Sequence, residues 1–210
     1  HLFNHSWGVF PSVHGAWIVS SEKFMQNIRA VNFLKLHGGF SETGNDGIPD
    51  YDSKAYFTAV RFMDKANGLV LSNLENNQIQ WETTAKWDIG ADMNLFNNKL
   101  SVSFDYFYGK TRNLLVQGIL PDYTGLNYYL NNSGTMSNQG YELSLNLKAL
   151  NLKKLKWELG LSVGHYDNKI LTLPDGDISS SIYGAEVLIQ SGLPAGAFYG
   201  YKSLGVFSTQ

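Results

Sequence analysis

Cysteine is absent from the 210 residues, which excludes disulfide frameworks, thiolate zinc sites and cysteine nucleophiles. The chain has no unbroken apolar run of the about 18 residues that a membrane-spanning helix needs. Neither sign of charge predominates, because the chain has 16 Lys and Arg and 18 Asp and Glu. We therefore expect no nucleic-acid partner. Phosphate-binding, dinucleotide-binding and GxSxG motifs are missing, so no cofactor and no enzymatic activity are expected.

What the sequence does contain is alternation of apolar and polar residues, the period of a strand with two unlike faces. Residues 87–95 place Trp, Ile, Ala, Met and Leu on one parity and Asp, Gly, Asp and Asn on the other. The alternation resumes over 100–109 after the Asn-rich stretch 96–99, which predicts an antiparallel hairpin. Three further strands are predicted over 34–41, 141–148 and 157–164.

These segments are long for a soluble sandwich, whose strands average about five or six residues, and suit a tilted membrane strand of about 9–11. The polar parity carries small and charged residues, which is typical of a barrel lumen. The sequence therefore predicts an all-β fold, part of an antiparallel transmembrane outer-membrane β-barrel. Aromatic residues at the strand ends are expected to form its interfacial girdles: Trp7, Trp17, Trp81, Trp87, Tyr106, Tyr108, Trp157 and Tyr166.

The connections alternate in length. Residues 96–99 and 149–156 form short turns, whereas 44–80, 117–131 and 173–192 are predicted as long loops rich in Gly, Pro, Asp, Asn and Tyr. Outer-membrane barrels place short turns in the periplasm and long loops outside the cell. We expect the same orientation here.

Candidate functional residues follow from these faces and loops. Five carboxylates on the polar parity are expected to face the lumen and to hydrogen-bond to water or to a plug: Asp88, Asp92, Asp105, Glu142 and Glu158. Four tyrosines in the predicted outer loops could stack on sugar rings, or equally pack loop on loop: Tyr51, Tyr123, Tyr128 and Tyr129.

No metal site is expected from the histidines, which are scattered. The acidic stretch with Asp46, Asp50 and Asp52 is a weak candidate for Ca²⁺, since its spacing fits no EF-hand loop. A solvated acidic loop is the favoured interpretation.

Six segments follow one another along the chain: WGVFPSVHGAW, LKLHGGFSETGN, WETTAKWDIGADMNLFNNKLSVSFDYFYGKTRNLL, NNSGTMSNQGYELSLN, KWELGLSVGHYDNKI and GLPAGAFYGYKSLGVF. Taken in this order, they resemble the later barrel region of SusC/RagA-type TonB-linked outer-membrane proteins. The resemblance covers nearly the whole chain and is most specific over 81–115 and in NQGYELSLN at 138–146.

The resemblance implies a TonB-dependent importer in the outer membrane of a Gram-negative, Bacteroidetes-like bacterium, with a barrel of about 22 strands. It further implies import of oligosaccharides or peptides with a SusD-like surface lipoprotein. The TonB complex would be contacted through parts of the protein outside this sequence.

We expect residues 1–210 to be one partial barrel domain of about six or seven strands, without the plug. The first residues have neither Met nor the features of a signal peptide, so a piece of a longer protein is expected. Two other hypotheses stay open. The chain could be a soluble glycan-binding β-sandwich, or a barrel-bound hydrolase that would need a nucleophile and a base.

Overall fold

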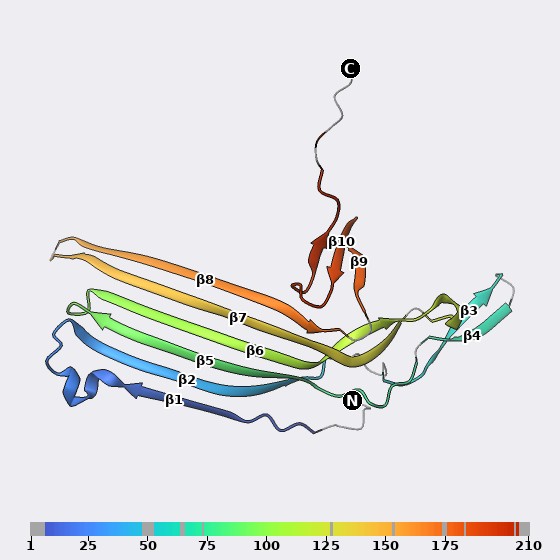
Figure 1. Cartoon of the computed structure of the whole chain (residues 1–210), viewed down its shortest axis with the longest axis horizontal. Coiled ribbons are helices and arrows are strands. Elements are labelled where there is room, and N and C mark those ends of the chain that lie inside the picture. Colours follow the sequence, from blue (N-terminus) through green and yellow to red (C-terminus); the bar gives the residue numbers. More distant parts are fainter. Residues whose placement is uncertain are drawn as a thin grey trace, which may run out of the picture.

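The computed structural model describes residues 7–47, 53–63, 66–72, 74–126, 128–152, 154–173, 176–182, 184–203 and 205. Its main feature is one curved antiparallel sheet with the strand order β1-β2-β5-β6-β7-β8 (Figure 1). The strands are β1 (Ser12–Ile18), β2 (Val31–Asn45), β5 (Glu82–Leu95), β6 (Leu100–Ile119), β7 (Tyr128–Asn151) and β8 (Lys156–Thr172). The predicted antiparallel all-β fold is confirmed, and the sheet does not close into a barrel within these residues.

The short connections lie together at one end of the sheet (Figure 1). The predicted hairpin turn after β5 is confirmed: Phe96, Asn97 and Asn98 have φ of 54°, 58° and 60°. Asparagine tolerates this left-handed region better than most residues, which explains the Asn-rich composition. The turn after β7 is tighter than predicted, since Leu152 and Leu155 already exchange backbone hydrogen bonds of 2.8 and 3.3 Å.

The long connections contain more strand than the sequence predicted. Within the predicted loop 44–80 lies a hairpin of β3 (Phe57–Phe62) and β4 (Ala66–Leu71). A second small sheet, of β9 (Ile178–Ile182), β10 (Ala185–Ile189) and β11 (Ala197–Tyr199), stands upright from the main sheet (Figure 1).

The predicted loop 117–131 is mostly wrong, because β6 and β7 extend into it. Gln117 pairs with Leu130 and Gly118 with Tyr129, so only residues 120–127 connect the two strands. Strand β1 was not predicted at all, since its alternation is short and interrupted by Gly15.

The register sorts the side chains of the main sheet onto two faces. Trp87, Tyr108 and Phe40 share one row, and Met93, Val102 and Leu34 share another on the same face. On β6 this apolar face runs from Leu100 to Tyr108, which is about 27 Å along the strand. A strand tilted by about 40° from the barrel axis would turn this length into an apolar band about 20 Å high. The strand lengths and faces thus have the dimensions of a membrane wall.

Apolar side chains on this face remain exposed, with Trp87 at 60% and Ile89 at 64%. No second sheet among the described residues covers them, because the two smaller sheets lie at the long-connection end (Figure 1). The sandwich alternative is therefore wrong for this fold. None of the helices in the described ranges is long and apolar enough to cross a membrane.

Five of the eight predicted girdle aromatics lie on the apolar face of a strand, namely Trp17, Trp87, Tyr106, Tyr108 and Trp157, and three do not. Trp7 precedes β1 and belongs to no strand. Tyr166 pairs with Gly140 on the polar face, because an even position on β8 points away from the leucines. Trp81 precedes β5 and packs against Phe10, with ring centroids 5.7 Å apart.

Buried residues gather at the long-connection end. Ile79 is fully buried against Trp81, Leu115 and Leu130, which fixes the segment before β5 onto β6 and β7. A second cluster packs the base of the β9–β10–β11 sheet onto the wall: Val116, Ile170 and Leu173, with Leu114, Met136, Ile178 and Ile189 around them. This end of the sheet is consequently the better packed one.

Candidate functional site

The polar face of β2, β5 and β6 carries a network of charged side chains centred on Asp92. Its carboxylate accepts a hydrogen bond of 2.8 Å from the Ser103 hydroxyl and one of 3.2 Å from Lys35 Nζ. His37 Nε2 lies 3.6 Å from Asp92 and 3.7 Å from Asp105, so one imidazole stands between two carboxylates. His37 of β2 therefore links carboxylates of two different strands, β5 and β6.

The same face extends the network toward β1. His14 Nδ1 lies 3.8 Å from an Asp88 carboxylate oxygen. On this face, the row of His14 and Asp88 is next to the row that contains His37. Asp105 faces Glu142 directly across β6 and β7. Two like charges in this position disfavour the sheet unless a cation or a hydrogen-bond donor approaches them.

Glycines make these approaches possible. A Cβ on Gly90 would lie 2.2 Å from Asp105 Oδ1 and 2.4 Å from His37 Cε1, so both side chains occupy the space above this residue. A Cβ on Gly39 would lie 2.2 Å from His14 Nδ1. Glycine at these two positions therefore creates the room in which the charged groups meet.

Of the five predicted polar-face carboxylates, four lie in this region and one does not. Asp88, Asp92, Asp105 and Glu142 share the network or its border, whereas Glu158 pairs in register with Lys148 toward the short-turn end. The sequence prediction missed His14, Lys35 and Ser103 as members. Parity already placed Lys35 and His37 opposite the leucines of β2, but their contacts depend on the register between strands.

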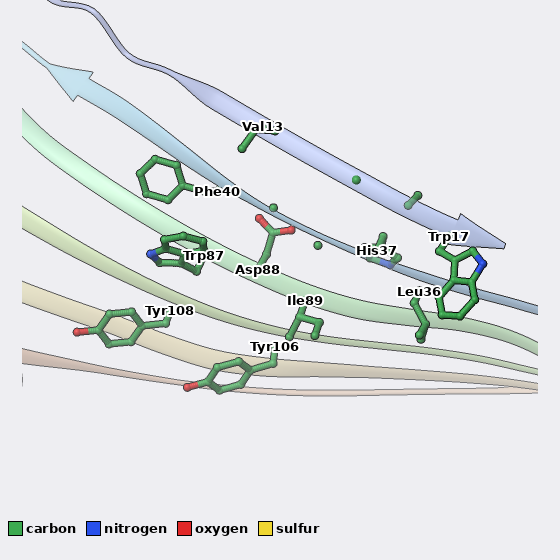
Figure 2. Close-up of a pocket in the computed structure, with 14 residues that line it drawn as sticks. Val13, Trp17, Leu36, His37, Phe40, Trp87, Asp88, Ile89, Tyr106 and Tyr108 are labelled. Atoms are coloured by element: carbon green, nitrogen blue, oxygen red, sulfur yellow. The ribbon is translucent and has the colours of Figure 1, made fainter. Parts of the chain in front are cut away.

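The apolar face carries a groove of about 890 Å³ across β1, β2, β5 and β6. Figure 2 shows the rings of Phe40, Trp87 and Tyr108 in one row across β2, β5 and β6 on one side of the groove. Phe40 and Trp87 pack with centroids 4.6 Å apart, and Gly15 and Gly38 leave the floor without side chains. The lining is mainly apolar, although His37 and Asp88 also border the groove, and this suits contact with hydrocarbon.

The four predicted tyrosines are not brought together by the part of the chain that the structure describes. Tyr123, in the short helix η3 (Asp122–Thr124), is 90% exposed at the long-connection end. Tyr129 was expected in a loop but lies in β7, where its ring fills the space above Gly118, 2.3 Å from where a Cβ would be. Tyr128 is also a strand residue in its backbone, and Tyr51 lies outside the described residues.

The weak calcium candidate stays a prediction. Asp46 is described, but Asp50 and Asp52 lie outside the described residues. Within the described ranges, no group of three or more His, Asp or Glu side chains is arranged to hold a metal ion.

A two-faced, antiparallel sheet of membrane length defines the class of outer-membrane β-barrel walls. The family model for the TonB-dependent receptor-like β-barrel matches residues 3–201. This chain belongs to the TonB-dependent receptor family and is part of its outer-membrane β-barrel.

Within the family the chain is of the SusC/RagA type. TonB-dependent receptors P3 and P39 of Formosa agariphila are 33% and 34% identical over 97% of this chain, which covers 21% and 19% of their own length. TonB-dependent receptor SusC of Bacteroides thetaiotaomicron is 28% identical over 84% of the chain and 18% of its own length.

A solved structure of the RagAB peptide transporter superposes with a TM-score of 0.78 at 26% identity, over 90% of this chain and 21% of that one. The chain therefore spans about a fifth of the length of the relatives it matches.

Proposed function

We propose that this chain is a wall segment of a TonB-dependent importer that takes up oligosaccharides or peptides together with a SusD-like lipoprotein. The observation that carries the proposal is the sheet itself, with an exposed apolar face on one side and a charged network on the other. In a closed barrel the first face would contact lipid and the second would line the lumen.

The polar face supports a role in holding a plug or in lining a wet channel. Asp105 and Glu142 face each other, and neither forms a close ion pair with Lys or Arg in the described part of the chain. Side-chain or backbone donors of a plug, or water, would satisfy these oxygens. Asp88, with His14 3.8 Å away, lies at the border of the same surface.

One of the two substrate classes has support from a relative, because the similar RagAB structure is that of a peptide transporter. Uptake of oligosaccharides rests on the resemblance to the SusC/RagA type alone. Tyr123 presents an exposed ring at the long-connection end, where substrate would arrive if this end faces the exterior. An aromatic ring of this kind can stack on a sugar or pack on a peptide side chain.

The test uses the full-length receptor in cells from which the native copy has been removed. We expect uptake of fluorescent oligosaccharides or peptides that depends on TonB, and a surface lipoprotein that co-purifies with the receptor. Cells that take up neither class, with the receptor present in the outer membrane, would contradict the proposal.

Two neighbouring substitutions separate the faces. Phe104→Arg places a charge on the apolar face and should cost about 2–4 kcal/mol of barrel stability near the membrane centre, so the receptor level falls. Asp105→Arg, one residue on, should leave the level unchanged and alter uptake. Equal loss of receptor in both variants would mean that the two faces are not lipid and lumen.

A further inference from the structure

Three cations gather on the outward side of the wall, at the long-connection end. Lys110 of β6, Ser137 of β7 and Lys169 of β8 form one continuous row of the ladder. This row lies on the same face as Tyr108 and Tyr141, and Arg112 follows Lys110 by two residues on that face. The cations thus stand directly beyond the aromatic end of the apolar band.

Their spacing lets the three side chains converge on one anion. Alternate strands lie about 9.6 Å apart and alternate residues about 6.7 Å apart, distances that Lys and Arg side chains can bridge. No carboxylate among the described residues lies within 4 Å of Lys110, Arg112 or Lys169. Of these, Arg112 and Lys169 are exposed and Lys110 is half-buried.

The outward carboxylates nearby do not neutralise this group. Asp167 precedes Lys169 by two residues, but its oxygen lies 3.1 Å from His165 Nε2. Glu42 belongs to the row through Ala85, two strands away from Lys110. The surface around Ser137 is therefore positive.

A shallow pocket of about 380 Å³ opens beside Lys169. Ser137 and Gln139 of β7 and Asp167 of β8 line it together with Gly192 and Pro194. It therefore offers hydroxyl, amide and carboxylate groups that can hydrogen-bond a sugar, next to a cation that can pair with a phosphate.

The turn that closes the pocket is held firmly against β8. Gly192, at φ 92°, donates to the Ile170 carbonyl at 2.8 Å, and the Ile170 N–H donates to the Leu193 carbonyl at 2.9 Å. This is the pattern of a glycine β-bulge. The Ala195 N–H also donates to Asn168 Oδ1 at 2.7 Å, so the pocket wall is fixed.

We propose that Lys110, Arg112 and Lys169 bind the phosphate of a lipid A-type glycolipid headgroup, with its sugar in the pocket between β7, β8 and the Gly192 turn. The depth fits, because headgroups begin where the apolar band and its aromatic girdle end. The charge fits too, since basic side chains at this depth attract anionic lipid. The inference rests on two parts of the proposed function, the contact of the apolar face with lipid and the exposure of the long-connection end to the exterior, but not on any imported substrate.

The experiment titrates the purified full-length receptor in neutral detergent with lipid A that carries its phosphates, with dephosphorylated lipid A, and with inorganic phosphate. We expect phosphorylated lipid A to bind at least about tenfold more tightly than the dephosphorylated form, since each basic contact is worth about fivefold. Equal affinity for the two forms, or displacement by equimolar inorganic phosphate, would overturn the proposal. This comparison needs no variant.

The triple variant K110Q/R112Q/K169Q should bind phosphorylated lipid A about tenfold or more weakly, and arginine at 110 and 169 should preserve binding. The matched control is Lys86→Gln, which removes a cation of β5 on the opposite face, where Lys86 lies 5.3 Å from the Phe107 ring centroid. An equal loss with Lys86→Gln would show that overall charge, not this site, attracts the lipid. Unchanged binding by a correctly assembled triple variant would also refute the site.

Discussion

At the scale of single residues, the polar face depends on the absence of side chains as much as on their presence. Gly90 lies between Asp105 and His37 and leaves the space in which their atoms come within 3.7 Å. Gly160, on the same face of β8, has no atom within 4 Å of a Cβ position. Two glycines of one face thus have opposite tolerance for a methyl group.

We predict that Gly90→Ala destabilises the full-length receptor by about 1–3 kcal/mol, because the methyl group forces His37 and Asp105 apart. Gly160→Ala should be neutral or stabilising by about 0.5–1 kcal/mol, since it only reduces the backbone freedom that this residue loses on folding into the strand. Folding titrations in lipid vesicles would measure both. Similar costs at the two positions would contradict the packing around Gly90.

Glu75 is a second residue whose behaviour follows from its contacts, and it lies in the connection before β5. Its carboxylate accepts hydrogen bonds of 2.7 Å from Asn77 and 3.1 Å from Lys54, and these contacts, the Asn77 bond first, lower the pKa of Glu75. A lowered pKa in the folded state means that Glu75 stabilises this connection above the ordinary carboxylate pKa and stops doing so as pH falls through the lowered value.

We therefore expect hydrogen exchange of residues 74–79, corrected for its intrinsic pH dependence, to be slow near neutral pH and to accelerate in acid. Asn77→Ala should raise the pKa of Glu75 and shift the acceleration toward higher pH. Glu186→Gln, a substitution in β10 far from this contact, serves as the control. A profile that Asn77→Ala leaves unchanged would show that the hydrogen bond does not set the pKa.

At the scale of elements, alternation alone predicted the central parts of β2, β5, β6, β7 and β8. It succeeded there because one face must be apolar over the full height of a membrane, which leaves a period of two in the sequence. Beyond that height the constraint disappears. The outer part of β6, with bulges around Leu114, carries no such period, and its last residues, 117–119, fall in the predicted loop.

The charged network shows the same boundary between what sequence can and cannot predict. Parity predicts Asp88, Asp92 and Asp105 on one face, and the register of β5 against β6 places the three on the same side of the sheet. The approach of His37 to two carboxylates from different strands depends on the register of β2 against β5 and of β5 against β6. No local pattern encodes both registers, so the contact was not predictable.

The β5–β6 turn is an element whose sequence and backbone agree closely. Asn97 has φ of 58°, in a region that disfavours β-branched residues. Asn97→Val should destabilise the hairpin by about 1–2 kcal/mol, whereas Asn97→Gly should be neutral or mildly stabilising. Asn146→Val, at an extended position in β7, is the matched control, and the folded fraction after refolding into lipid vesicles is the measurement. If Asn97→Val lowered the folded fraction no more than Asn146→Val does, the left-handed backbone at residue 97 would be contradicted.

At the scale of the whole molecule, the two ends of the sheet differ in construction. One end has tight turns, at Phe96–Asn98 and between Leu152 and Leu155, and the other has the β3–β4 hairpin, the upright β9–β11 sheet and the two buried clusters (Figure 1). Among the described residues, the second end carries the longer connections and most of the buried side chains. The proposed function requires this end to face the exterior.

Because the 210 residues contain no cysteine, the orientation can be tested with introduced thiols. Tyr123→Cys places one at a position that is 90% exposed at the long-connection end, and Lys154→Cys places one at the exposed short turn between β7 and β8. A maleimide on a polymer too large for porins should label Tyr123→Cys in intact cells and Lys154→Cys only after the outer membrane is permeabilised. The receptor with neither substitution shows the background from the rest of the protein. The reverse pattern would place the long connections of this wall in the periplasm and would contradict the orientation that the proposed function requires.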